Sequence, residues 1–297
     1  MDKMTELVET NWLKENLNNP EVKIIDGSWH MPGSGLNATE IFKKQHIPNS
    51  IFIDLEEISD QNSDLPHMMP TENNFSKKIS SYGIKNDDQL IIYDAHGIFS
   101  AARIWFVFKA FGHKKVSILN GGFPAWIDSG GKISDQINNL EPTNYQAKLN
   151  NFLIVSYKEI FNNLSKNKYQ IIDARSPERF SGLAEESRPG MKSGHIPNSK
   201  NLYFNDLIDP NTKKFIEKEE IEKLINNQGI DLKDIFSRNV GTGVAANAVL
   251  QHQNGRDIFK DPKSGESVFS NLNVSQRSLL MDTVKTEVAS VKGNGFV

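Results

Sequence analysis

The sequence predicts an α/β protein of two domains in tandem, each a small parallel sheet flanked by helices, with the second domain incomplete. Three observations lead to this prediction. The 297 residues are enough for two domains of about 150 residues each. Two sequence segments recur once, in the same order. Short apolar runs alternate with helical stretches, as they do in parallel sheets covered on both faces.

The recurrence is domain-sized. KIIDGSW at 23–29 returns as QIIDARS at 170–176, and QHIPNS at 45–50 returns as GHIPNS at 194–199. The offset is 147 between Asp26 and Asp173, and 149 between His46 and His195. A repeat of this length indicates a duplicated domain rather than a solenoid. Taken singly, each piece is typical of a turn or of a connection whose proline sets an extended path.

The elements follow in chain order. The first copy has apolar, β-branched runs typical of strands, and between them a largely apolar stretch at 99–112 that predicts a helix. The second copy begins with a helix over SYKEIFNNL and a strand over YQIIDA, and a linker is expected near 130–150. The domains are thus placed at 1–140 and 150–250, followed by a divergent segment at 251–297. The predicted strands of the first copy are 22–26, 89–94 and 115–122.

Composition excludes several function classes. A formal net charge of −3 gives no field that would attract nucleic acid or an anionic membrane. No apolar run reaches the length of about 18 residues that a spanning helix needs, and the first residues lack a secretory pattern, so a cytoplasmic location is expected. The residues contain no cysteine, which excludes disulfides, thiolate zinc sites, iron–sulfur clusters and a cysteine nucleophile.

Four segments together resemble the tandem rhodanese-domain sulfurtransferases, in form closest to the bacterial 3-mercaptopyruvate type, over residues 5–250. They are GHIPNS, SRPGMKSGHIP at 187–197, SDQNSDLPHMMP at 59–70 and FSAARIWFVFKAFGHKKVSILNGGFPAWIDSGG at 99–131. The resemblance implies a silent first domain and a second domain whose loop cysteine takes sulfur from 3-mercaptopyruvate or thiosulfate. That sulfur passes to a thiol or cyanide acceptor, and neither cofactor nor metal is implied. Protein partners are not indicated.

The resemblance also assigns binding residues. Arg179 and Arg188 match the two arginines that hold the carboxylate and keto group of the donor, as a guanidinium fork can. In the alternative interpretation both arginines pair with neighbouring glutamates, Glu178, Glu185 or Glu186. His67 matches a first-domain histidine facing the site, with Glu56 behind it, although a single histidine is more often structural.

The nucleophile of the family is missing. The family loop reads Cys-Gly-[Ser/Thr]-Gly-Val-Thr-Ala, and here Val240 stands in the cysteine's place, ahead of Gly241, Thr242, Gly243 and Val244. The equivalent residue of the first copy is Asp94, 146 residues earlier. Phe236–Asn239 reads FSRN where the first copy has the apolar strand LIIY, and the later strand has no counterpart. Either the tail supplies a replacement strand or the second domain is poorly folded.

Three hypotheses remain open. The chain is a sulfurtransferase by descent, inactive as written because it has no cysteine. It is a pseudoenzyme or anion-binding module, whose Gly241–Gly243 loop opens a helix and holds an anion through backbone N–H groups. Or it is an altered, for example frameshifted, version of an active enzyme. Separately, the spacing of apolar residues at 274–292 is compatible with a short amphipathic helix. A phosphatase of similar fold is disfavoured, since it too needs a loop cysteine.

Overall fold

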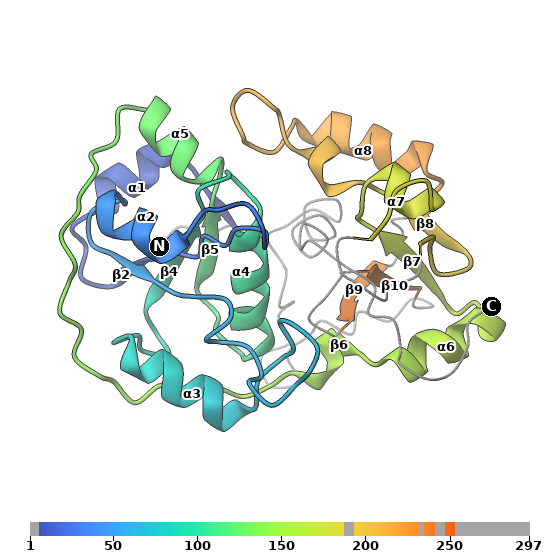
Figure 1. Ribbon diagram of the computed structural model, residues 1–297, viewed down its shortest axis with the longest axis horizontal. Coiled ribbons are helices and arrows are strands. Elements are labelled where there is room, and N and C mark those ends of the chain that lie inside the picture. Colours follow the sequence, from blue (N-terminus) through green and yellow to red (C-terminus); the bar gives the residue numbers. More distant parts are fainter. Residues whose placement is uncertain (1–5, 187–192, 232–234, 241–246, 253–297) are drawn as a thin grey trace.

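The computed structural model describes residues 6–186, 193–231, 235–240 and 247–252, the last two ranges as backbone only. Several predictions fall outside these residues: Arg188, Gly241, Thr242, Gly243, Val244, the side chain of Val240 and the segment 274–292. The described residues form two sheets, each with helices around it (Figure 1).

The first sheet has five parallel strands in the order β1-β5-β4-β2-β3. The strands predicted from apolar runs are confirmed, and the bounds are β1 (Leu7–Val8), β2 (Val22–Asp26), β3 (Ser50–Phe52), β4 (Gln89–Tyr93) and β5 (Val116–Leu119). The helices are α1 (Thr10–Asn16), α2 (Ala38–Lys44), α3 (Glu72–Ser81), α4 (Ser100–Ala110) and α5 (Gly122–Asp128).

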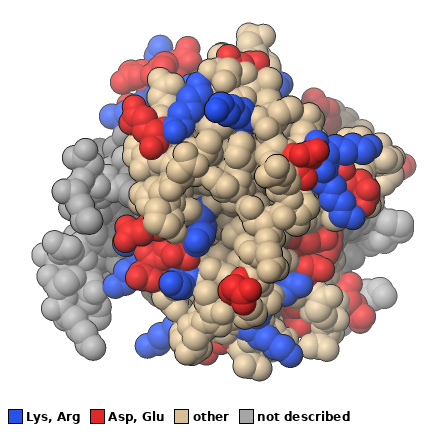
Figure 2. Space-filling model, turned by 90° about the vertical axis from the view of Figure 1, so that its left-hand side faces the viewer, with Lys and Arg blue, Asp and Glu red and all other residues tan. Residues whose placement is uncertain are grey.

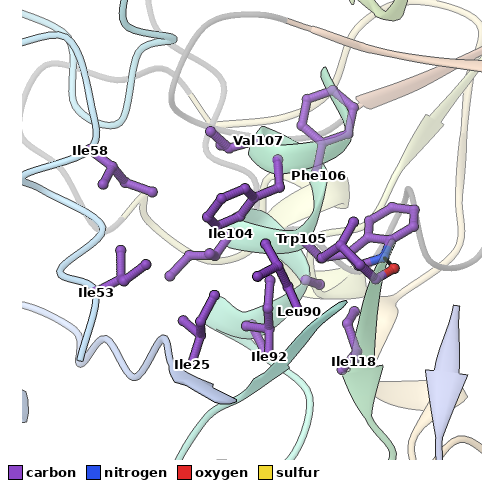
Figure 3. Close-up of a cluster of buried hydrophobic side chains, with 14 of the residues drawn as sticks. Ile25, Ile53, Ile58, Leu90, Ile92, Ile104, Trp105, Phe106, Val107 and Ile118 are labelled. Atoms are coloured by element: carbon purple, nitrogen blue, oxygen red, sulfur yellow. Dashed lines mark hydrogen bonds between the residues drawn. The ribbon is translucent and has the colours of Figure 1, made fainter. Parts of the chain in front are cut away.

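Both faces of this sheet are buried, which explains why its strands are continuously apolar. Leu90 and Ile92 of β4 pack in one cluster with Ile104 and Trp105 of α4 (Figure 3), and the same cluster includes residues of α3. Ile91 and Tyr93 point to the opposite face, in a second cluster with residues of α1 and α5. α4 is buried almost all round, so its sequence lacks the polar stripe of a surface helix.

The second sheet has the corresponding order, β6-β9-β10-β7-β8, but it is not wholly parallel. β6 pairs parallel with β9, and β7 pairs parallel with β8, whereas β10 runs antiparallel to both of its neighbours. The strand bounds are β6 (Ile154–Val155), β7 (Tyr169–Asp173), β8 (Ser199–Asn201), β9 (Ile235–Val240) and β10 (Asn247–His252). The elements around the sheet are η1 (Asn151–Leu153), α6 (Tyr157–Lys166), α7 (Pro177–Ser181), η2 (Phe204–Leu207) and α8 (Lys218–Asn227).

The direction of β10 corrects the sequence analysis. A helix was expected after Gly243, and residues 247–252 form a strand instead. Residues 241–246 are too few for the crossover of a dozen or more residues that a parallel neighbour needs, so β9 and β10 must be antiparallel. Residues 247–252 thus pair between β9 and β7. The tail from which a replacement strand was expected lies outside the described residues from residue 253 on.

The sheet position of Val240 also differs from that expected. β9 lies beside β6 with Val155 opposite Val240, as β5 lies beside β1 with Val8 opposite Leu119. Val240 therefore occupies the place of Leu119 in the first sheet. The numerical offset pairs it with Asp94, which follows β4, and β10 now holds the place of β4.

The segment between the sheets packs along the first domain. Thr143 donates its backbone N–H to Ser80 O at 2.9 Å, and Asn150 donates to Ala110 O at 2.7 Å. Tyr145 is fully buried in the larger core cluster of the first domain. The linker predicted near 130–150 is thus a fixed part of the structure.

The two domains also contact each other directly. Ile208 of the second domain belongs to the larger core cluster of the first, and Phe99 lies against Phe204 with ring centroids 6.1 Å apart. Lys214 Nζ lies 2.7 Å from Glu9 Oε2. The carboxyl ends of β2 and β4 therefore lie near the second domain.

The surface carries mixed charges. Basic and acidic side chains are interspersed on the face shown in Figure 2, with no large area of one sign. Within the described ranges, no helix combines the length and apolar character needed to cross a membrane.

Candidate functional site

The carboxyl ends of β2 and β7 carry the same local arrangement. Asp26 accepts the backbone N–H of Ser28 at 2.9 Å, and Asp173 accepts the backbone N–H of Arg175 at 3.0 Å. The two copies differ in the side chain two residues after the aspartate. Ser28 contributes only a hydroxyl, which donates to Asp26 at 2.5 Å, whereas Arg175 brings a guanidinium.

Four ionised side chains form a buried cluster after β7. Arg175 Nη2 lies 2.5 Å from Asp173 Oδ2, and its Nη1 lies 2.6 Å from Glu186 Oε1. Arg179 Nη2 contacts the other oxygen of Glu186. Two guanidinium groups and two carboxylates make the cluster neutral. Burial disfavours the charged form of Arg175, but the bonds to Asp173 and Glu186 outweigh burial, and the pKa of Arg175 lies above its usual value.

Arg179 is thus paired with one of the glutamates that the alternative interpretation named. The partner, Glu186, has a side chain that is only 1% exposed, so the pair is not a loose contact on a solvated loop. One donor of Arg179 is available to a ligand, because its buried Nε has no hydrogen-bond partner in the described part of the chain. Substrate binding by Arg179 stays a prediction, and Arg188 lies outside the described residues.

His67 and Glu56 do meet, as the resemblance predicts. His67 Nε2 lies 2.7 Å from Glu56 Oε1, and Trp29 Nε1 donates to the same oxygen at 3.0 Å. His67 has a φ of 55°, in the left-handed region that non-glycine residues rarely adopt. Arg103 holds it there by donating from Nη2 to His67 O at 2.6 Å. Burial lowers the pKa of Arg103 to about 10.

In the loop after β4, the carboxylate of Asp94 occupies the place where an anion could bind. Asp94 is fully buried, and it accepts backbone N–H groups from His96 at 2.8 Å, Phe99 at 2.7 Å and Ala101 at 2.8 Å. Successive N–H groups at the start of a helix form an anion-binding nest. The nest of the first domain is therefore occupied from within, which the sequence analysis did not predict.

The recurring HIPNS segments serve as connections. His46 Nδ1 lies 2.7 Å from Phe42 O, and His195 Nδ1 lies 2.7 Å from Phe180 O. Each imidazole stacks on the ring of that same phenylalanine. The equal geometry supports the structural interpretation of both histidines.

Comparisons with known proteins agree with this architecture. Residues 9–129 and 156–259 each match the family described as Rhodanese-like domain. The chain is 38% identical over 261 residues to thiosulfate/3-mercaptopyruvate sulfurtransferase 1, mitochondrial, of Arabidopsis thaliana, covering 81% of this chain and 69% of that protein. It is 36% identical over 248 residues to the 3-mercaptopyruvate sulfurtransferase of Rattus norvegicus, covering 81% and 82%.

Solved structures give the same result. The crystal structure of SseA from Escherichia coli, described with the "Rhodanese" fold of 3-mercaptopyruvate sulfotransferases, matches with a TM-score of 0.75 at 26% identity, covering 98% of this chain and 100% of that one. The Tum1 protein of Saccharomyces cerevisiae matches with a TM-score of 0.71 at 29% identity, covering 79% and 83%.

Proposed function

Because this chain belongs to the rhodanese-like domain family of sulfurtransferases, we propose that it binds the anionic sulfur donors of its relatives without taking up their sulfur. The observation that carries the proposal is the absence of cysteine from all 297 residues. The donors are thiosulfate and 3-mercaptopyruvate, the compounds named for the relatives.

Sulfur transfer needs a nucleophile that this sequence lacks. A thiolate attacks the sulfane sulfur and carries it as a persulfide to the acceptor. Valine, which the sequence resemblance aligns with the family's cysteine, has neither a lone pair nor a proton to exchange. Serine and threonine hydroxyls are far weaker nucleophiles at neutral pH.

Donor binding rests on the cluster of Asp173, Arg175, Arg179 and Glu186. The cluster is neutral, so it does not repel an anion, and Arg179 Nε is a buried donor without a partner. An unpaired buried donor is costly, and a ligand oxygen would satisfy it. By resemblance, Arg188 would add the positive charge that the cluster itself does not have.

The proposal is tested by measuring binding and turnover in parallel. Isothermal titration with thiosulfate at millimolar concentration should show binding, and incubation with thiosulfate and cyanide should yield no thiocyanate above the protein-free blank. Arg179→Gln should weaken thiosulfate binding about tenfold, since it removes one charge-assisted bond. Lys43→Gln, at an exposed pair on α2, is the matched control and should bind as the wild type does.

Either half of the proposal can fail. Thiocyanate formation that scales with protein concentration and persists after dialysis would contradict catalytic silence. The absence of binding heat at millimolar thiosulfate, or equal affinity in Arg179→Gln, would contradict donor binding.

The antiparallel β10 favours a second candidate. β10 runs antiparallel in the middle of the second sheet, whereas the corresponding strand of the first sheet is parallel. A frameshift in the gene of an active enzyme would produce such a local change. Sequencing the gene and its transcript decides this: a shifted frame that restores a cysteine before Gly241 supports alteration, and an uninterrupted frame contradicts it. A cytoplasmic location stays a prediction, since one relative is named as mitochondrial.

A further inference from the structure

Two histidines meet at the carboxyl edge of the first sheet, outside the site described above. His30 follows β2 and His96 follows β4, and their atoms Nδ1 and Nε2 lie 3.0 Å apart. The rings are nearly perpendicular, with an interplanar angle of 81°. The HIPNS segments, the arginine cluster and the His67–Glu56 pair do not involve either residue.

We propose that His30 and His96 form a binding site for a divalent transition metal, at which copper(II) binds most tightly through His30 Nδ1 and His96 Nε2. Imidazole nitrogen is the commonest metal ligand in proteins and suits copper, nickel and zinc. In the described residues no cluster of three or more histidine and carboxylate ligands occurs, so solvent would complete the coordination.

The distance between the two nitrogens selects the geometry. With metal–nitrogen bonds of about 2.0–2.1 Å, two nitrogens 3.0 Å apart subtend about 94° at the metal. That angle fits adjacent positions of a tetragonal site, which copper(II) and nickel(II) prefer. Copper(II) is also the divalent ion that such ligands hold most strongly.

The backbone at or beside each histidine is fixed by a hydrogen bond. The N–H of His96 donates to Asp94 Oδ1 at 2.8 Å, and next to it Gly97 has a φ of 111°. A Cβ at Gly97 would lie 2.6 Å from Lys213 Cβ, so this turn is fitted against the second domain. On the other strand, Trp29 N donates to Ser100 Oγ at 3.0 Å, one residue before His30. A rigid pair binds a metal with little loss of conformational freedom.

Electrostatics keep the pair ready for a cation. Burial lowers the pKa of His30, and the neighbouring His96 lowers it further. Asp94 acts in the opposite direction on His30, which places its negative charge close enough to attract a cation. His30 Nε2 is buried and has no hydrogen-bond partner in the described residues, and a bound metal would replace the proton that His30 Nδ1 and His96 Nε2 share.

Copper(II) titration of the full chain tests the site. Glycine in excess removes weakly held metal, and the emission of Trp29, adjacent to His30, should fall until one equivalent is bound. The electron paramagnetic resonance spectrum should show coupling to two nitrogens. His30→Phe and His96→Gln should each weaken copper binding about tenfold or more, since each removes a direct ligand. Zinc should bind more weakly than copper.

His195→Gln is the matched control, because that imidazole is also exposed but has no histidine partner; it should bind copper as the wild type does. Wild-type affinity in either site variant, or no stoichiometric binding by the wild type in glycine, would overturn the proposal. Tryptophan emission and circular dichroism check the fold. If His30→Phe unfolds, His96→Gln decides, since His96 is exposed.

Discussion

The carboxylate of Asp94 accepts the backbone N–H of Ala101 at 2.8 Å, across the turn that opens α4. The same carboxylate also binds the N–H groups of His96 and Phe99. A residue of the first domain therefore fills the space in which a helix start could hold an exogenous anion. This would account physically for the silent first domain that the resemblance implies, independently of what the second domain lacks.

Replacing Asp94 with alanine should empty this nest. The Asp94→Ala variant should lose about 1–3 kcal/mol of unfolding free energy, since buried N–H donors lose their acceptor. Sulfate should then raise its melting temperature more than it raises that of the wild type, at ionic strength matched with sodium chloride. Asp209→Ala, which removes an exposed carboxylate from a turn, serves as the control. Equal sulfate responses would show that the nest does not accept a free anion.

Val240→Cys alone should not restore sulfur transfer. Val240 is the last residue of β9, opposite Val155, and the next described residues form a strand rather than a helix. Among the described residues no helix begins after β9, so a thiolate there has no described helix start to lower its pKa. Thiocyanate formation from thiosulfate and cyanide measures the result, and titration with a thiol reagent confirms that the new cysteine is present. Turnover well above the blank would mean that the loop adopts the family's shape.

Arg175→Met should destabilise the second domain strongly. The side chains of Arg175, Asp173 and Glu186 are all nearly inaccessible, and removing the shared cation leaves buried carboxylates uncompensated. The expected loss is about 3–5 kcal/mol in urea unfolding followed by circular dichroism. Lys214→Met breaks the exposed pair with Glu9 and should cost at most about 1 kcal/mol. Similar losses in both variants would contradict the assigned role of burial.

Asp26 and His113 should give opposite pH dependences between about pH 4 and 6.5. Burial raises the pKa of Asp26 from 3.8 to about 6, so the folded state binds this proton more tightly, and stability falls as pH rises through this window. Asp26→Asn should therefore gain stability relative to the wild type, by up to about 3 kcal/mol more at pH 7 than at pH 4. Urea titrations across this range measure the difference, and a constant offset would contradict it.

Burial lowers the pKa of His113 from 6.5 to about 4, so the folded state favours the neutral ring. His113 therefore costs stability as pH falls below 6.5. In the wild type the two residues partly offset each other, and His113→Gln should reveal the Asp26 effect more fully. A wild-type profile that keeps its shape in His113→Gln would show that folding does not lower the pKa of this ring.

The strands of the first domain could be predicted from the sequence because both faces of their sheet are buried. Ile91 and Ile92 could only be apolar, and α4 has no polar stripe to obscure its pattern. The direction of β10 was not predictable from its composition, since the resemblance favoured a helix; the short connection at 241–246 was the available signal. Choosing Glu186 over Glu178 and Glu185 as the partner of Arg179 needed tertiary geometry. The same holds for His30 and His96, which no spacing rule connects.

The segment before Asn150 has a consequence for how such proteins can be recombined. Tyr145 stacks on His113 with centroids 5.8 Å apart and lies in the same cluster as Phe75 and Phe108. The first repeat therefore does not end with α5, although the matched family region ends at residue 129. A chimaera joined after residue 129 would lack Tyr145 and leave a cavity in the core of the first domain. A junction after Asn150 would carry the first core across intact.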